Sequence, residues 1–153
     1  MNTLVMGIRR RVICHVFAAC VAFVLVAPIV FMAADRQSPI IIHETTIFPP
    51  SVRAGDTVLV TWTATELRGC EGTIYRRFID SQGTIFEIAP VPSIYRGLLT
   101  SGKKTFSSSI AIPHGLASGP AAYTGTREYR CNPLHWIWPI REKVAPTHFT
   151  VIR

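Results

Sequence analysis

Residues 55–70 read GDTVLVTWTATELRGC, and this stretch shows the clearest alternation of side chains in the sequence. Successive side chains of a β-strand point to opposite faces, so alternating apolar and polar residues predict a strand with one buried face. A Gly-Asp turn begins the stretch and a cysteine ends it. The side chains expected to face the core are Val58, Val60, Trp62 and Ala64, and those expected to face outward are Thr57, Leu59, Thr61 and Thr63.

The sequence after residue 38 predicts several more short strands. Residues 73–79 and 84–88 flank a turn at residues 80–83, and together they form the clearest hairpin. Residues 89–92 read APVP and are expected to take the chain out of the sheet, because proline lacks the N–H that a ladder needs. With seven to nine short strands, no amphipathic helix and no internal repeat, the predicted fold is an all-β sandwich. Its other strands are expected at residues 40–44, 104–112, 121–131 and 146–151.

An uncharged apolar run occupies residues 12–34. As a helix this run would extend about 34 Å, which is enough for the hydrocarbon core of a bilayer. The alternative is a cleaved secretory signal, but Phe31 or Met32 would then occupy a position that requires a small side chain. We therefore predict an uncleaved transmembrane helix, or signal anchor. The predicted organisation is a cytoplasmic segment of residues 1–11, the helix of residues 12–34, a linker of residues 35–38 and a β-sandwich domain of residues 39–153.

The charges that flank the apolar run predict its orientation. Arg9, Arg10 and Arg11 precede the run, whereas Asp35 and Arg36 cancel each other after it. Positively charged flanks stay in the cytoplasm, so the domain is expected outside it. The predicted location is the cell membrane, crossed once, with the C-terminal domain in the periplasm or the extracellular space.

The formal charge of +7 does not indicate a nucleic-acid-binding protein. Residues 1–36 contribute +3, and the remaining +4 is spread singly along the domain rather than in a run. A diffuse charge of this size favours solubility more than phosphate binding. The pairs Arg76-Arg77 and Lys103-Lys104 are interpreted as solvated strand and turn residues, with anion contacts as the alternative. The expected partners are membrane lipid, through the N-terminal helix, and a protein of unknown identity.

Two of the four cysteines, Cys70 and Cys131, lie outside the apolar run and at the ends of expected strands. Exported domains fold in an oxidising compartment, where such a pair forms a disulfide by default. Closing a loop of about 60 residues stabilises a fold by up to about 4 kcal/mol in the chain-entropy model. We therefore predict a disulfide between Cys70 and Cys131.

The run Tyr129-Arg130-Cys131 resembles immunoglobulin-like domains, in which a tyrosine two residues before the second cysteine forms a tyrosine corner. This resemblance implies an immunoglobulin-like or fibronectin-like Greek-key sandwich over residues 38–153. Such domains mostly bind or space other molecules. The sequence departs from antibody domains because Trp62 and Cys70 lie on or just after one strand, whereas an antibody domain places its first cysteine one strand earlier and its tryptophan one strand later.

Residues 129–135 also resemble the copper loop of cupredoxins, which are exported Greek-key sandwiches. This resemblance implies Cys131 and His135 as two ligands of a copper carrier. No methionine follows position 32 and no histidine lies between positions 43 and 114, so the rest of the ligand set is missing. We therefore expect no metal and no cofactor.

A hydrolase is the least favoured class. The aspartates of the exported part, Asp56 and Asp80, each lie in a predicted turn, and no Gly-x-Ser-x-Gly elbow occurs. Glu66 and Glu71 flank Cys70 without a partner that indicates acid–base chemistry. We predict that the chain is not an enzyme.

Residues 134–140 read LHWIWPI and hold two of the three tryptophans. One interpretation is a loop at the end of the sandwich, pinned by Cys131, in which His135, Trp136 and Trp138 form a binding surface. The alternative is a last core strand, with alternate residues of this run facing inward.

The predicted function combines the anchor, the sandwich and this loop. We expect a membrane-tethered extracytoplasmic binding or structural domain that interacts with proteins in an envelope or assembly. An exported copper-binding protein is the alternative.

Overall fold

The uncharged N-terminal segment is part of one long helix. In the computed structural model, which describes residues 2–96 and 102–153, helix α1 extends over Asn2–Ala34. Its stretch Cys14–Ala34 is long and apolar enough to cross a membrane by length and composition. N-terminal secretory signals share these properties. The predicted apolar helix is therefore present, and its helical conformation begins before residue 12.

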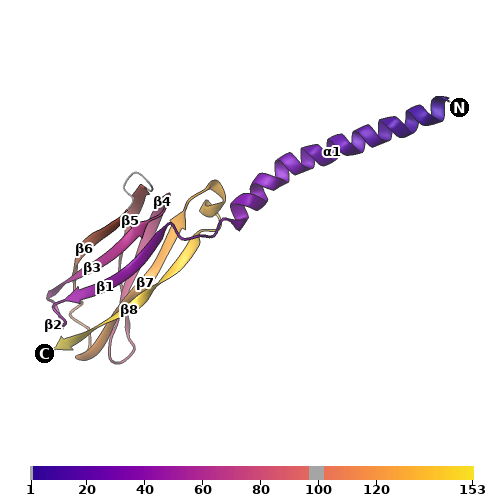
Figure 1. Cartoon of the computed structure of the whole chain (residues 1–153). Helices are drawn as coiled ribbons and strands as arrows, with labels where there is room; N and C mark the ends of the chain where they lie inside the picture. Colours follow the sequence, from indigo (N-terminus) through magenta and orange to yellow (C-terminus); the bar gives the residue numbers. More distant parts are fainter. Residues whose placement is uncertain (1, 97–101) are drawn as a thin grey trace. The chain divides into compact units, whose positions relative to one another are not determined.

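Gln37–Arg153 form a separate unit built from two β-sheets (Figure 1). All strand pairs are antiparallel except β2 with β8, which is parallel. The eight strands that the structure describes fall within the predicted number. One sheet has the order β1 (Ile40–Phe48), β3 (Thr57–Glu66) and β6 (Lys103–Ala111). The other has the order β2 (Ser51–Arg53), β8 (Ile140–Ile152), β7 (Gly119–Arg130), β4 (Gly69–Ile79) and β5 (Ile85–Arg96).

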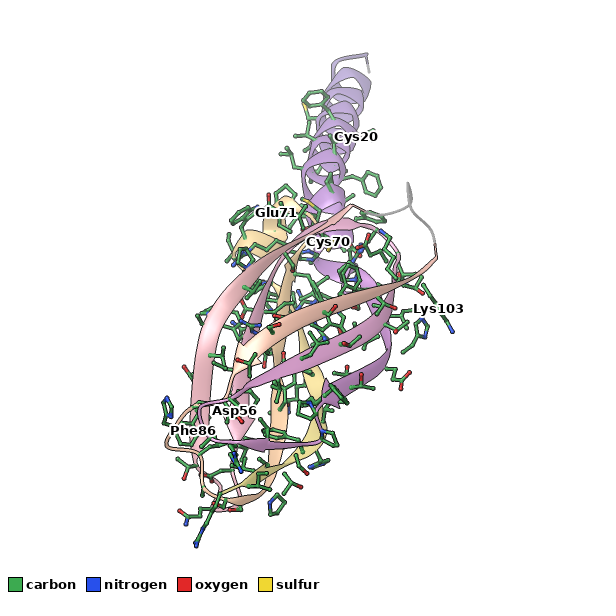
Figure 2. All side chains as sticks on the ribbon, turned by 90° about the vertical axis from the view of Figure 1, so that its left-hand side faces the viewer. Cys20, Asp56, Cys70, Glu71, Phe86 and Lys103 are labelled. Carbon is green, nitrogen blue, oxygen red and sulfur yellow. A yellow bond between two sulfur atoms is a disulfide. The ribbon has the colours of Figure 1, made fainter. Side chains whose placement is uncertain are left out.

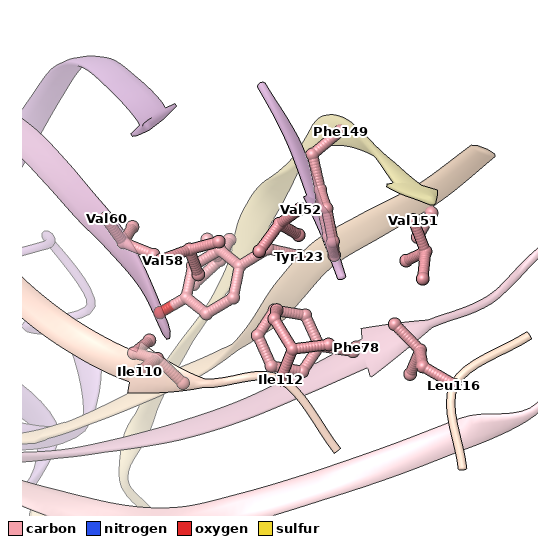
Figure 3. Packing of buried hydrophobic residues seen from close by; sticks show 12 residues of the cluster. Val52, Val58, Val60, Phe78, Ile110, Ile112, Leu116, Tyr123, Phe149 and Val151 are labelled. Atoms are coloured by element: carbon pink, nitrogen blue, oxygen red, sulfur yellow. The ribbon is translucent and has the colours of Figure 1, made fainter. Parts of the chain in front are cut away.

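The core lies between the two sheets and follows the alternation predicted for β3. Val58, Val60 and Ala64 are buried, and Trp62 is partly buried. The larger apolar cluster combines side chains from both sheets, including the aromatic rings of Phe78 and Phe149 (Figure 3). Each large apolar side chain buried in this way stabilises the fold by about 1.5–3 kcal/mol. A smaller cluster consists of Ile40, Ala64, Tyr129 and Ile140.

The prediction that residues 89–92 leave the sheet is wrong. Strand β5 continues to Arg96, and Pro92 pairs with Thr73 of β4. Among the described strands β5 pairs with β4 alone and is therefore an edge strand, where a proline is tolerated because its missing N–H can face the unpaired side. The register shifts beside Pro90, so the irregularity is absorbed within the strand.

The two ends of the sandwich carry different parts of the chain. Cys70 and Glu71 lie at one end, which we call the disulfide end, and Asp56 and Phe86 lie at the other (Figure 2). The disulfide end holds the last residues of β7 and the first of β8, since Tyr129 pairs with the first residue of β8. The chain also enters the domain there, because the carbonyl of Pro39 accepts the N–H of the residue that follows β3.

Candidate functional site: the tryptophan loop

The connection between β7 and β8 forms a capped helical turn. Residues 132–138, which we call the tryptophan loop, contain the short 3-10 helix η2 (Pro133–Trp136). The side-chain Oδ1 of Asn132 accepts the backbone N–H groups of Leu134 and His135 at 3.0 and 3.2 Å. Asparagine is a preferred N-cap, and proline suits the first position of a helix because its missing N–H has no helical partner there. The pair Asn132-Pro133 therefore starts a turn where a strand was the alternative.

The aromatic side chains of this loop face solvent. Trp136 is 64% exposed, Ile137 is 86% exposed and Trp138 is 55% exposed. The interpretation of residues 134–140 as a last core strand is therefore wrong up to Pro139. Only Ile140, the first residue of β8, is buried as that interpretation required.

His135 lies inside the loop rather than on its surface. Its side chain is completely buried, and its Nδ1 accepts the backbone N–H of Cys131 at 3.1 Å. The side-chain nitrogen of Asn132 lies 3.2 Å from its Nε2. The prediction that His135 contacts a partner at the surface is therefore wrong. Its buried ring instead stabilises the loop from inside through the Cys131 N–H.

The predicted disulfide fixes the start of the loop. Cys70 and Cys131 are bonded, and their Cα atoms lie 4.5 Å apart. Glu71 of β4 pairs with Arg130, the last residue of β7, so the bridge joins Cys70 of β4 to the residue that directly follows β7. The loop therefore begins from a rigid position.

The bridge and the burial of His135 remove the two copper ligands that the cupredoxin resemblance implied. The sulfur of Cys131 is bonded to Cys70 and is not a thiolate. The Nδ1 of His135 is occupied by a backbone N–H. Within residues 2–96 and 102–153, no group of three or more His, Cys, Asp or Glu side chains is arranged to hold a metal ion.

The surroundings of the loop combine apolar and charged side chains. The guanidinium carbon of Arg130 lies 5.0 Å from the centre of the Trp136 ring, in a cation–π contact. A surface hollow of about 470 Å³ lies beside this pair, and Glu71 and the exposed Ile94 line it together with Arg130, Trp136 and the bridge. The exposed apolar surface therefore has charged groups of both signs at its margin, as interfaces commonly do.

The acidic residues considered for hydrolysis lie elsewhere and have structural contacts. The carboxylate of Asp80 accepts backbone N–H groups in the turn after β4. The buried Glu66 forms an ion pair with Lys104 at 3.2 Å. Asp56 lies in the turn before β3, at the end of the sandwich opposite Cys70 (Figure 2). The structure thus spreads these carboxylates over separate turns and strands.

Comparison with known proteins gives no family for this chain. No family model matches the sequence, and no curated protein matches it. The alkylpurine DNA glycosylase AlkC of Pseudomonas fluorescens, bound to DNA containing an abasic site analog, is similar over 76% of this chain and 31% of its own, at 9% identity and a TM-score of 0.43. The sporulation control protein Spo0M of Bacillus subtilis is similar over 76% of this chain and 51% of its own, at 10% identity and a TM-score of 0.43. The protein described as ApaA of Bordetella pertussis is similar over 74% of this chain and 94% of its own, at 11% identity and a TM-score of 0.41.

The matched region is thus about a third of the AlkC chain and half of the Spo0M chain. With TM-scores below 0.5, these likenesses carry no argument about function.

Proposed function

We propose that this chain is a single-pass membrane protein that carries an immunoglobulin-like sandwich outside the cytoplasm and binds a protein partner through the tryptophan loop. The observation that carries the proposal is the exposure of Trp136, Ile137 and Trp138. The loop that presents them is held by the Asn132 cap and the buried His135. Three neighbouring large apolar side chains in water are costly to leave uncovered. Exposed apolar surface of this kind typically marks an interaction site.

The strand order supports the immunoglobulin-like part of the proposal. If β1, β3, β4, β5, β6, β7 and β8 are named A, B, C, C′, E, F and G, one sheet becomes ABE and the other becomes GFCC′ with the short strand β2 added beside G. Immunoglobulin-like sandwiches pair their strands in this way. Tyr129 lies on the strand corresponding to F, two residues before Cys131, and its hydroxyl donates to Glu142 at 2.9 Å.

Three features support an anchored domain outside the cytoplasm. Helix α1 contains a stretch that can span a bilayer. The arginines at positions 9–11 precede this stretch, and such flanks favour the cytoplasmic side. The disulfide of the sandwich is typical of domains that fold in an oxidising compartment.

The composition of the loop favours a protein as the partner. Tryptophan and arginine are the residues most enriched among interface hot spots, and Trp136 and Arg130 are already stacked in a cation–π contact. The loop also costs little entropy to order on binding, because the Asn132 cap and the buried His135 hold it in place. Five residues separate Ala34 from Ile40, and an extended chain spans about 22 Å at most between these two residues. We therefore expect a partner that is itself a membrane or envelope protein.

The test places a photoreactive amino acid at Ile137 in the full chain and irradiates intact membranes. We expect one discrete protein adduct, which is lost when Trp136 and Trp138 are both replaced by alanine. A photoreactive group at Leu59, an exposed apolar position on the three-stranded sheet, is the matched control and should not give this adduct.

The same alanine variant also tests the fold. Because both tryptophans are exposed, its melting temperature should stay within a few degrees of the parent, with an effect of about 1 kcal/mol or less. Adducts with lipid alone, or an identical protein adduct from Leu59, would show that the loop does not bind a protein partner.

A further inference from the structure

The interior of the sandwich contains a layer of polar side chains between its two apolar clusters. On the inner face of β7, Arg127 lies between Tyr123 of the larger cluster and Tyr129 of the smaller one. Arg76 of β4 lines the same space from the neighbouring strand, and Trp62 packs against both clusters. Arg127 is buried and Arg76 is half-buried, and core packing alone does not explain this placement, because charged side chains are rarely buried without a partner.

Arg127 is buried and forms no ion pair in the described part of the chain, although Glu44 and Glu142 line a hollow with it. Its side chain is only 6% exposed, and it makes no hydrogen bond or ion pair within the described part of the chain. Its cross-strand neighbour Glu142 accepts the hydroxyl of Tyr129 at 2.9 Å and that of Ser38 at 3.1 Å instead. Burial of a guanidinium in this state is costly unless an anion accompanies it.

Arg76 and Ser93 also have unused polar atoms in this space. The Nη1 of Arg76 donates to Ser108 at 3.4 Å, and its Nη2 donates to the carbonyl of Ala89 at 3.1 Å. Its Nε is buried without a hydrogen-bond partner, and so is the hydroxyl oxygen of Ser93. Unsatisfied buried donors of this kind usually have a ligand, an ion or a water as partner.

Tyr123 contributes a further donor at the boundary of the layer. Its ring packs against Phe78 in the larger cluster, and its hydroxyl points away from that ring (Figure 3). Burial raises the pKa of Tyr123, and the nearby charges of Arg76 and Arg127 offset only part of this rise. The hydroxyl therefore stays protonated at neutral pH and can donate a hydrogen bond.

These groups surround a cavity of about 230 Å³. Trp62, Ile74 and Val91 supply its apolar walls, and the hydroxyl-bearing residues Thr45, Ser107 and Ser108 complete the lining. The exposed residues Val91 and Ser107 lie on β5 and β6, which are edge strands of the two different sheets. The opening of the cavity is therefore at the side of the sandwich where β5 and β6 face each other.

We propose that this cavity binds a small organic carboxylate. Guanidinium groups bind carboxylates through charge-assisted hydrogen bonds, so Arg76 and Arg127 hold the anionic end, with the Tyr123 hydroxyl as an additional donor. The apolar body of the ligand lies against Trp62 and the aliphatic walls. An inorganic anion would form hydrogen bonds with the arginines but would leave the apolar walls without contacts. The ligand must also be small, because the cavity volume is below that of pockets for drug-sized ligands. This site is distinct from the tryptophan loop.

The experiment titrates the full chain in detergent micelles with benzoate. Replacing Trp136 and Trp138 by phenylalanine leaves Trp62 as the one tryptophan, so its fluorescence reports on the cavity. We expect a saturable change with a Kd below about 1 mM, together with a higher melting temperature. Benzamide, which has the same shape without the charge, and inorganic phosphate should each bind at least about tenfold more weakly.

Substitutions test whether benzoate binds in this cavity. Arg127→Gln should weaken benzoate binding at least about tenfold, whereas Arg141→Gln should not change it, since Arg141 is exposed and pairs with Glu128 on the outer face. Val91→Phe narrows the opening of the cavity and keeps both arginines. It should therefore weaken benzoate binding, and it provides the test if Arg127→Gln does not fold. Equal benzoate binding by parent and Val91→Phe, or no response of the parent, would overturn the proposal. Phosphate binding as tight as that of benzoate would overturn the assignment of an organic ligand.

Discussion

Asp80 fixes the turn between β4 and β5 through backbone hydrogen bonds. Its Oδ1 accepts the N–H groups of Gln82 and Thr84 at 2.9 and 2.8 Å, and its Oδ2 accepts the N–H of Ala117 at 3.3 Å. Burial acts to raise the pKa of Asp80, but these N–H groups outweigh it and lower the pKa below its ordinary value of 3.8. The ionised carboxylate is therefore the form that stabilises the turn.

Asp80→Asn should lower the melting temperature at neutral pH, because the charge that these N–H groups stabilise is lost. Since the folded-state pKa lies below 3.8, the stabilisation is present above that value and is lost as the pH falls through the folded-state pKa. Thermal scans at decreasing pH should show the difference between parent and variant shrinking below about pH 4. A difference that stays constant over this range would contradict the account. Asp56→Asn, at an exposed position, is the control.

The two interior arginines show what sequence patterns cannot reveal about single residues. The sequence favours solvated side chains for the pair Arg76-Arg77, and this prediction is correct for the exposed Arg77. Strand alternation places Arg76 on the inner face, where its guanidinium lines the cavity. Arg127 is one of many single charges in the sequence. Its burial depends on the pairing of β7 with β4 and β8, which no local pattern encodes.

At the scale of elements, alternation predicted the strands that have one buried face and no proline. Strand β3 is the clearest case, because its period-two pattern has no competing interpretation. Strand β5 is longer than the sequence predicts, because local sequence does not show which strands are edges and tolerate proline. Strand β8 begins at Ile140, several residues before the predicted strand, and absorbs Pro146 where its register with β7 shifts.

The sequence does not decide the secondary structure of the tryptophan loop. The alternate spacing of its apolar residues fits both a strand and a short turn that exposes its aromatic side chains. The signal that could have separated the two was Asn132-Pro133, an N-cap followed by a proline at the first helical position. The burial of His135 could not be foreseen in this way, since it depends on the position of the Cys131 N–H in the folded chain.

Asn132→Ala should destabilise the loop, because two backbone N–H groups lose their acceptor. We expect a cost of about 1 kcal/mol, measured by chemical unfolding, and greater access of Trp136 and Trp138 to a soluble quencher. Asn132→Asp is the matched control, since aspartate is an equally good N-cap and should restore both values. If the alanine and aspartate variants behave alike, the cap does not hold the loop.

The molecule as a whole consists of an apolar helix followed by a disulfide-linked sandwich. The helix and the sandwich form two separate compact units, and the sequence predicts each from a regular pattern of side chains. The disulfide is predicted from the expected oxidising compartment rather than from local structure. Its presence therefore supports the prediction that the sandwich is exported. Export of the sandwich on an uncleaved anchor is the claim on which the proposed function depends.

The most direct test of this claim fuses a reporter that is active only after export to the residue after Arg153. We expect an active reporter that stays in the membrane fraction after an alkaline wash, because arginines such as those at positions 9–11 favour the cytoplasmic side and α1 contains a stretch long and apolar enough to span a bilayer. Replacing the three arginines by glutamate, which removes the orienting charge, should reduce this activity. Activity only from a matched cytoplasmic reporter, or a fusion released into the soluble fraction, would contradict the account.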